Sequence, residues 1–218
     1  ETAVRPDVRR ALETAVQRLA DAHREQLVEL LSDRDPAVVA GAARRVAELG
    51  IGSAAPELLR LLKHSEAMLR LAGVEALARL RAAVAGSHIT KLLEDPDREV
   101  RVAAARALAT LEFTAARTSL EAAVGSKRLR AADRSERVAF FEAYGRLAGA
   151  EGVQVLARIL NGRGFLGRAG NTEERTCAAL GLARARHPSA RAALSAASND
   201  GDPVVRTTVQ RALREEQA

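Results

Sequence analysis

The stretch of this sequence that most resembles a site for chemistry is NGRGFLGRAGN, residues 161–171. Its Gly162, Gly164 and Gly167 spell a GxGxxG string, which in dinucleotide-binding folds follows a strand and opens a helix that holds the pyrophosphate. Here the string follows GVQVLARIL, which predicts a helix, and the next helix is expected to begin only near Thr172. The acidic residue that would bind a ribose about 20 residues later is missing, since the chain there reads ARHPSARA. We therefore expect an insertion loop and no dinucleotide site.

Other residue types that perform catalysis do not form a recognisable set. The single Cys177 lies in a helical pattern with no histidine placed to activate it, which is typical of a buried thiol. The four histidines (His23, His64, His88 and His187) lack the spacing of metal ligands. No Ser/His/Asp set, carboxylate pair or phosphate loop stands out either. We therefore predict a protein that is not an enzyme, with no catalytic residues, cofactor or metal.

The composition indicates an all-helical protein with a basic surface. Of the 218 residues, 47% are hydrophobic but only 2% are aromatic, so a core of Ala, Leu and Val requires closely packed helices. The 34 Lys and Arg exceed the 28 Asp and Glu, which gives a net charge of +6. This charge suits nucleic acid, acidic protein or anionic lipid, although interspersed charges are also typical of ordinary solvated helix faces.

The strongest pattern in the sequence is an internal repeat. Seven similar stretches begin at Asp7, Ala37, Met68, Glu99, Ser135, Glu173 and Val204, and their third residues are Arg9, Val39, Arg70, Arg101, Arg137, Arg175 and Arg206. These third residues are 30, 31, 31, 36, 38 and 31 positions apart. A period of about 31 residues accommodates two short helices and two turns, which is the unit of an α-solenoid.

Each of these stretches is expected to form the second helix of a helix pair. Six first helices precede them at matching spacing: HREQLVELL, PELLRLLKH, SHITKLLED, TSLEAAVGS, GVQVLARIL and SARAALSAA. We predict a single domain over residues 1–218 with six to seven repeats. Because the chain begins at Glu1 and the first repeat lacks its first helix, we expect a fragment of a longer array. No apolar run reaches the length of a membrane span, and we predict cytoplasmic localisation. Because the chain begins at Glu1 and not at a methionine, a removed signal peptide is left open.

The repeats resemble HEAT repeats, and their brevity makes them similar to the short HEAT-like repeats named after phycobilisome lyases. The pattern Asp-Pro-x-x-Val-Arg-x-x-Ala-x-x-Ala-Leu is carried best by residues 95–108 and 202–213, and the resemblance covers about residues 6–213. It implies an all-α, right-handed superhelix of stacked antiparallel helix pairs that acts as a scaffold for other proteins. The repeat name also implies a bilin-lyase accessory enzyme, but no chromophore pocket with a catalytic acid or thiol is identifiable.

The arginine column at the start of the second helices has two interpretations. It is either a row of ligand-binding cations or a structural ladder in which each arginine pairs with an acid of an adjacent turn. Asp35, Asp97, Asp133 and Asp202 lie within about four residues of the column, as a HEAT-like ladder requires. We therefore predict a structural ladder of Arg70, Arg101, Arg137, Arg175 and Arg206.

The outward face of the second helices is expected to line a concave groove. One column there alternates in sign, which lets neighbouring repeats neutralise one another and suits a phosphate backbone poorly: Arg44, Glu75, Arg106, Glu142, Leu180 and Arg211. Apolar residues on or beside this column predict a groove for a protein segment: Leu71, Val74, Val102, Val138, Phe141 and Leu180. Alternatively, these residues only pack against neighbouring repeats.

Two enlarged intervals place insertions between the first and second helices of consecutive repeats, in residues 125–135 and 161–171. We expect both to emerge side by side from one edge and to bind an acidic protein through Lys127, Arg128, Arg130, Arg163, Phe165, Leu166 and Arg168. The alternative is that Phe165 only caps the helix ends, and nucleic acid is the less favoured partner. Between the insertions, Phe140 and Tyr144 share one helix face, so we predict that both are buried.

Overall fold

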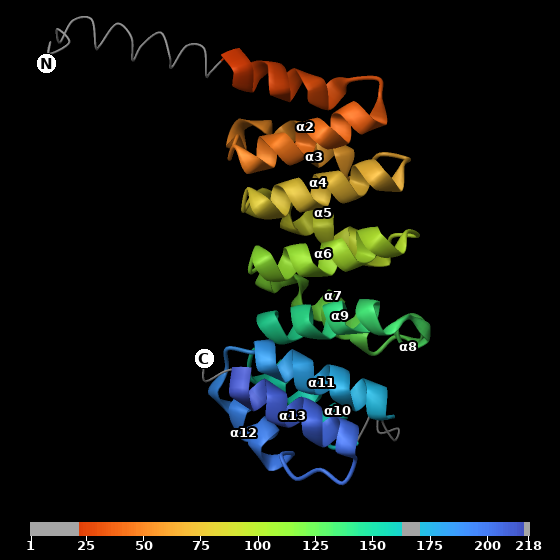
Figure 1. The fold of residues 1–218 in the computed structure, drawn as a ribbon, viewed down its shortest axis with the longest axis vertical. Helices are drawn as coiled ribbons and strands as arrows, with labels where there is room; N and C mark the ends of the chain where they lie inside the picture. The colour runs from red at the N-terminus through yellow and green to blue at the C-terminus, as the bar shows by residue number, and fades with distance from the viewer. Residues whose placement is uncertain (1–21, 163–170, 216–218) are drawn as a thin grey trace, which may run out of the picture. The chain divides into compact units, whose positions relative to one another are not determined.

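The computed structural model describes residues 22–162 and 171–215, and these residues form helices and turns without a strand (Figure 1). The predicted all-α repeat fold of antiparallel helix pairs is confirmed. The chain divides into two compact units, residues 1–82 and 83–218. The prediction of a single repeat domain is not tested by this division.

The first unit contains two helix pairs in its described part. Residues 22–29 are helical and continue into the 3-10 turn η1 (Leu30–Ser32), which packs on α2 (Pro36–Glu48). After the turn η2 (Gly52–Ala54), α3 (Ala55–Leu61) packs against α4 (Ala67–Arg79), which in turn lies against α2. The side chains of Val46, Leu58 and Leu77 are fully buried in this unit.

The second unit contains four helix pairs. The first helices are α5 (Gly86–Lys91) with the turn η4 (Leu92–Glu94), α7 (Arg117–Val124), α10 (Ala150–Leu160) and α12 (Pro188–Ala196). The second helices are α6 (Arg98–Thr110), α9 (Arg134–Leu147), α11 (Thr172–Arg184) and α13 (Pro203–Glu215). The 3-10 turns η3 (Ala83–Ala85) and η5 (Thr114–Ala116) precede α5 and α7, and the short α8 (Lys127–Ala131) precedes α9.

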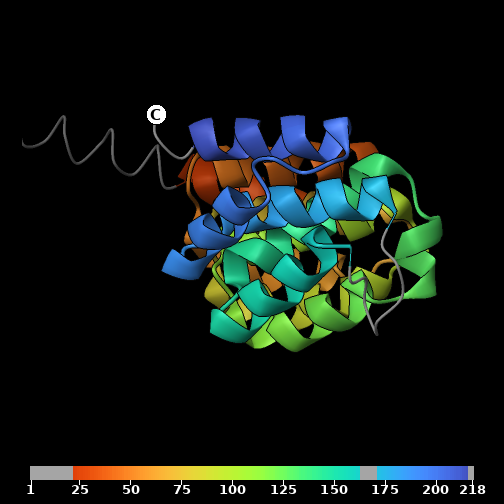
Figure 2. The ribbon, with the colours of Figure 1, turned by 90° about the horizontal axis from the view of Figure 1, so that it is seen from below.

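The second helices of this unit lie side by side in chain order. Helix α6 packs on α9, α9 on α11, and α11 on α13 (Figures 1 and 2). At the crossing of α9 and α11, a Cβ on Gly145 would collide with the carbonyl oxygen of Gly181. A Cβ on Gly181 would likewise lie 2.7 Å from the carbonyl oxygen of Phe141. Glycine at both positions therefore permits the close approach of the two helix backbones.

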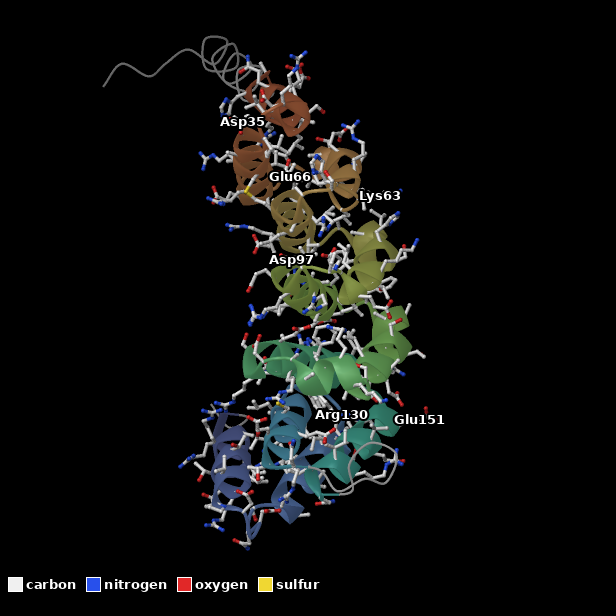
Figure 3. All side chains as sticks on the ribbon, turned by 90° about the vertical axis from the view of Figure 1, so that its right-hand side faces the viewer. Asp35, Lys63, Glu66, Asp97, Arg130 and Glu151 are labelled. Carbon is white, nitrogen blue, oxygen red and sulfur yellow. The ribbon has the colours of Figure 1, made fainter. Side chains whose placement is uncertain are left out.

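Aspartates begin several second helices because a carboxylate satisfies backbone N–H groups of the first turn. Asp35 accepts from the N–H of Ala37 at 2.8 Å, and Asp97 accepts from the N–H of Val100 at 3.1 Å. Figure 3 shows Asp35 and Asp97 where α2 and α6 begin. The proline that follows Asp35 occupies the first helical turn of α2, where its missing N–H costs nothing.

Helix α9 places large aromatic side chains in the core of the second unit. Phe140 and Tyr144 are both fully buried, which confirms the prediction made for them. The hydroxyl of Tyr144 donates to Oε2 of Glu121 at 2.9 Å. Burial, followed by this hydrogen bond to a carboxylate, raises the pKa of the Tyr144 hydroxyl above its usual range.

Candidate protein-interaction surfaces

The arginine column occupies one equivalent position in five of the described second helices. Each arginine is the fourth residue of its helix: Arg70 in α4, Arg101 in α6, Arg137 in α9, Arg175 in α11 and Arg206 in α13. In α2 the same position is Val39. The sequence register of the repeats is therefore correct.

The guanidinium groups of this column bind backbone carbonyls that precede their own helix. Their acceptors are the carbonyl oxygens of His64 and Ser65 for Arg70, Asp95 and Pro96 for Arg101, Arg130 for Arg137, Leu160 for Arg175, and Asp200 for Arg206. Several of these carbonyls close a first helix or its turn, where no intrahelical N–H is available. The column therefore ties these second helices to the segments that precede them, which for Arg137 is α8.

The acidic partners of the column differ from those that the sequence suggested. Arg101 pairs with Glu136 at 2.6 Å, Arg137 with Glu173 at 2.7 Å, and Arg175 with Asp200. Glu136 and Glu173 belong to the second helix of the following repeat, so these pairs hold neighbouring repeats together.

The aspartates expected in the ladder perform another task. Asp35, Asp97, Asp133 and Asp202 accept hydrogen bonds from N–H groups of their own helices. Asp133 also pairs with Arg98 at 2.5 Å, and hydrogen bonding to this arginine is the main reason why the pKa of Asp133 lies far below its usual range. Capping uses Oδ1 of each of these aspartates, and among the described residues none of the four forms an ion pair with an arginine of the column, although the charge of Asp97 still raises the pKa of Arg101.

Glu136 is the most buried acid of the ladder and holds two arginines. It is 2% exposed, and its Oε1 lies 2.6 Å from Nε of Arg101 and 2.7 Å from Nη1 of Arg128. Burial acts to raise the pKa of Glu136, but the hydrogen bonds from Arg101 and Arg128 outweigh it and leave this pKa below its usual value. The guanidinium of Arg128 also lies 5.5 Å from the centre of the Phe140 ring.

The first insertion is a short helix and not an open loop. In α8, Leu129 is buried and Ser126 accepts from its N–H, while Lys127 and Arg130 are exposed. The side chain of Arg128 is 39% exposed and bonded to Glu136, and its assignment as a partner-binding residue stays a prediction. The remaining residues of the predicted edge lie outside the described residues: Arg163, Phe165, Leu166 and Arg168. Whether the two insertions lie side by side is therefore not tested.

An open hollow lies between α2 and α4 in the first unit, and of the predicted groove residues Leu71 is in its lining. It has a volume of about 350 Å³, and Met68 and Leu71 are its largest apolar side chains. Met68 is 47% exposed and Leu71 is half-buried. Arg44 and Glu75 lie further along its wall, and within the described ranges neither forms an ion pair. Their opposite charges therefore do not neutralise each other directly.

Three of the predicted groove residues are buried, so the expectation that they are exposed is wrong. Val74, Val102 and Phe141 are 0%, 4% and 2% exposed, because the adjoining helices pack over this side of each second helix. The burial of these three side chains agrees with the alternative interpretation, in which they only pack against neighbouring repeats. Val138 and Leu180 are half-buried. Of the charged column in the second unit, Glu142 pairs with Arg184 at 3.0 Å.

A second hollow lies in the second unit and was not expected from the sequence. It is bounded by η4, α7 and the start of α8, with Lys91, Ser119, Ser126 and Arg128 in its wall. Its wall depends on the α8 insertion, which has no counterpart in the repeat pattern. The repeat alignment alone therefore gave no signal for it.

The described residues contain little that could perform chemistry. Burial raises the pKa of the Cys177 thiol to about 11, which keeps it protonated and unreactive at neutral pH. Groups of three or more metal-ligating side chains do not occur in ranges 22–162 and 171–215. None of the helices described there has both the length and the apolar character needed to cross a membrane.

These features define an all-α fold of stacked antiparallel helix pairs in the described residues. The family model for HEAT repeats matches residues 24–109, which confirms the resemblance seen in the sequence. A designed armadillo repeat protein in complex with the peptide (KR)4 is 19% identical, with 87% of this chain and 97% of that chain covered and a TM-score of 0.57. An engineered protein of the Northeast Structural Genomics Consortium is 23% identical, with 88% and 97% covered and a TM-score of 0.56.

More distant structures add no argument about function. The complex of CpcE and CpcF of phycocyanin lyase from Nostoc sp. PCC7120 is 18% identical, covers 88% of this chain and 94% of its own, and has a TM-score of 0.44. No curated protein matches the chain. The similarity to solved structures therefore shows the repeat fold and leaves the function to be argued from the surfaces.

Proposed function

We propose that this chain is a non-enzymatic scaffold that binds a segment of another protein in the hollow between α2 and α4. The proposal rests on one observation: exposed apolar side chains and charged side chains lie together on the wall of this hollow. Met68 and Leu71 offer an apolar contact, and the exposed Arg44, Glu75 and Arg79 offer hydrogen bonds that no described side chain uses. A segment with an apolar side chain flanked by polar groups fits this wall.

The fold supports this use of the wall. A designed armadillo protein of similar fold was solved with a bound peptide, so stacked helix pairs can hold an extended segment. Here the wall carries both signs of charge, Arg44 and Arg79 against Glu48 and Glu75, so it favours a partner of mixed charge. The cytoplasm is the proposed compartment for this contact.

Nucleic-acid binding is less well supported by the same surface. A groove that follows a phosphate backbone needs cations throughout, whereas Glu48 and Glu75 lie on the wall of this hollow. Aromatic side chains that could stack on bases are absent from its lining. We therefore propose a protein segment as the partner and retain nucleic acid as the alternative.

Placing carboxylates on the apolar part of the hollow should abolish peptide binding. Short peptides are first selected from a displayed random library against the unaltered chain. Met68→Asp with Leu71→Asp should weaken the binding of the selected peptides at least about tenfold, because apolar anchor contacts carry most of the energy of such interfaces. The measurement is fluorescence anisotropy of the labelled peptides.

Val84→Asp provides a matched control, because Val84 is an apolar residue that is 66% exposed and lies outside the hollow. This variant should retain the peptide affinity. Equal affinity of the double variant and the unaltered chain would show that the hollow between α2 and α4 is not the binding surface. Circular dichroism establishes that each variant keeps its helical content.

A further inference from the structure

The second hollow has a lining that favours negative charge. Its volume is about 460 Å³, and it lies between η4, α7 and the start of α8. Lys91, Ser119, Ser126 and Arg128 supply donor groups to its wall, while Glu94 is the one acid among its lining residues. Lys91 is exposed and makes no hydrogen bond or ion pair with the described residues.

The wall on the α8 side is held in place before any ligand binds. Leu129 is 1% exposed and anchors α8 in the core. Arg128 donates to the carbonyl oxygen of Leu93 at 3.1 Å and to Glu136 at 2.7 Å, which ties α8 to η4 and to α9. A partner that binds here therefore does not have to order α8, which lowers the entropic cost of association.

The side of α8 that faces away from this anchor is positively charged. Lys127 and Arg130 are three residues apart, so they share one face of the helix, and both are exposed (Figure 3 labels Arg130). Lys127 has no charged partner in the described residues, and Arg130 uses Nη1 to bind the carbonyl oxygen of Gly125.

The local acids do not offset this charge. Residues 125–137 contain five Lys and Arg and two Asp and Glu, and because Arg137 of this stretch pairs with Glu173 outside it, an excess of two positive charges is left. The two acids are Asp133 and Glu136, and both are already bonded to arginines. The surface formed by the second hollow and the outer face of α8 is therefore electropositive.

We propose that this surface, the α8 surface, binds an acidic segment of a protein. The inference deepens the proposed function, because it names a second contact of the same scaffold and the charge of the segment that it takes. Carboxylates of the segment pair with Lys91, Lys127 and Arg130, and the hydroxyls of Ser119 and Ser126 add hydrogen bonds. A nucleic acid fits less well, since the lining of the hollow holds no aromatic side chain and includes Glu94.

A fluorescent peptide of consecutive glutamates serves as the probe, and a DNA duplex of equal charge serves as its competitor. At physiological salt, Lys91→Glu with Lys127→Glu should weaken the binding of the peptide at least about tenfold, because two attractive contacts become repulsive. Neither lysine supports the fold, since both are exposed and unbonded in the described structure.

The matched control is Lys63→Glu with Arg158→Glu, which changes the net charge equally at exposed positions outside both hollows (Figure 3 labels Lys63). A loss in the first variant and a change below about threefold in the control supports the proposal. Equal losses in both variants, no loss in the first, or tighter binding of the duplex than of the peptide overturns it. Met68→Asp with Leu71→Asp should leave the binding of the glutamate peptide intact. A result that contradicts binding in the α2–α4 hollow can therefore be distinguished from one that contradicts binding at the α8 surface.

Discussion

Phe140→Ala is expected to lower the free energy of unfolding by about 3–5 kcal/mol, because it leaves a cavity in the middle of α9. The Phe140 ring is fully buried, and the guanidinium of Arg128 lies over it at 5.5 Å. The substitution thus removes apolar packing. It also removes the ring over which Arg128 lies, and Arg128 belongs to the ion cluster of Glu136, Arg101 and Arg128. The measurement is urea unfolding followed by circular dichroism, together with hydrogen exchange of α9, because repeat proteins can open unit by unit.

Two controls separate the cavity from other effects of substitution. Phe140→Leu keeps most of the buried volume and should cost clearly less than the alanine variant. Val84→Ala, at an exposed apolar position, should change the stability by less than about 0.5 kcal/mol. A cost below about 1 kcal/mol for Phe140→Ala would contradict the packing assigned to α9.

The sequence was sufficient to predict the fold because the same pattern of residues recurs in several repeats, and each repeat indicates the same helix register. The arginine column marks the fourth residue of α4, α6, α9, α11 and α13, so the register of each helix follows from one position. The burial of Phe140 and Tyr144 follows from the same register. Leu71, one of the predicted groove residues, lines the hollow between α2 and α4, and its use in binding stays a prediction.

The predictions that were wrong concern contacts between neighbouring repeats. Such contacts depend on the angle at which adjacent helices pack. The repeat pattern places Val102 and Phe141 beside the groove, but α6 packs on α9 and α9 on α11, and both side chains are buried. The nearest acids in the sequence are the capping aspartates, whereas Arg101 reaches Glu136, 35 residues away. Spacing along one helix cannot show such pairs, because the partner belongs to the next repeat.

The short helix α8 was not predicted from the sequence, for a different reason. It has five residues, too few for hydrophobic periodicity to reveal a helix. The one signal that could have found it is Ser126, whose hydroxyl accepts from the N–H of Leu129 and begins the helix. The sequence assigns Lys127 and Arg130 to an acidic partner, but the second hollow, whose wall α8 supplies in part, could not be predicted.

Glu136→Gln should destabilise the protein by about 3 kcal/mol at neutral pH, since it leaves Arg101 and Arg128 without their shared carboxylate in a buried site. The matched control is Glu173→Gln. Glu173 forms the equivalent pair with Arg137 in the next repeat but is 59% exposed, so its loss should cost less than about 1 kcal/mol. Chemical unfolding of both variants at pH 7 measures this difference.

The dependence of this effect on pH tests its electrostatic origin. The pKa of Glu136 is lower in the folded chain than its usual value, because the two arginine hydrogen bonds outweigh burial. A lowered pKa stabilises the folded state above the ordinary glutamate pKa of about 4.3, and this contribution is lost as the pH falls through the lowered value. The stability gap between the unaltered chain and Glu136→Gln should therefore be full at neutral pH and shrink below about pH 4, where protonation makes the glutamate neutral like glutamine. A gap of constant size across this range would assign the loss to packing, and the buried ion cluster would then not be what holds α8 and α6 to α9.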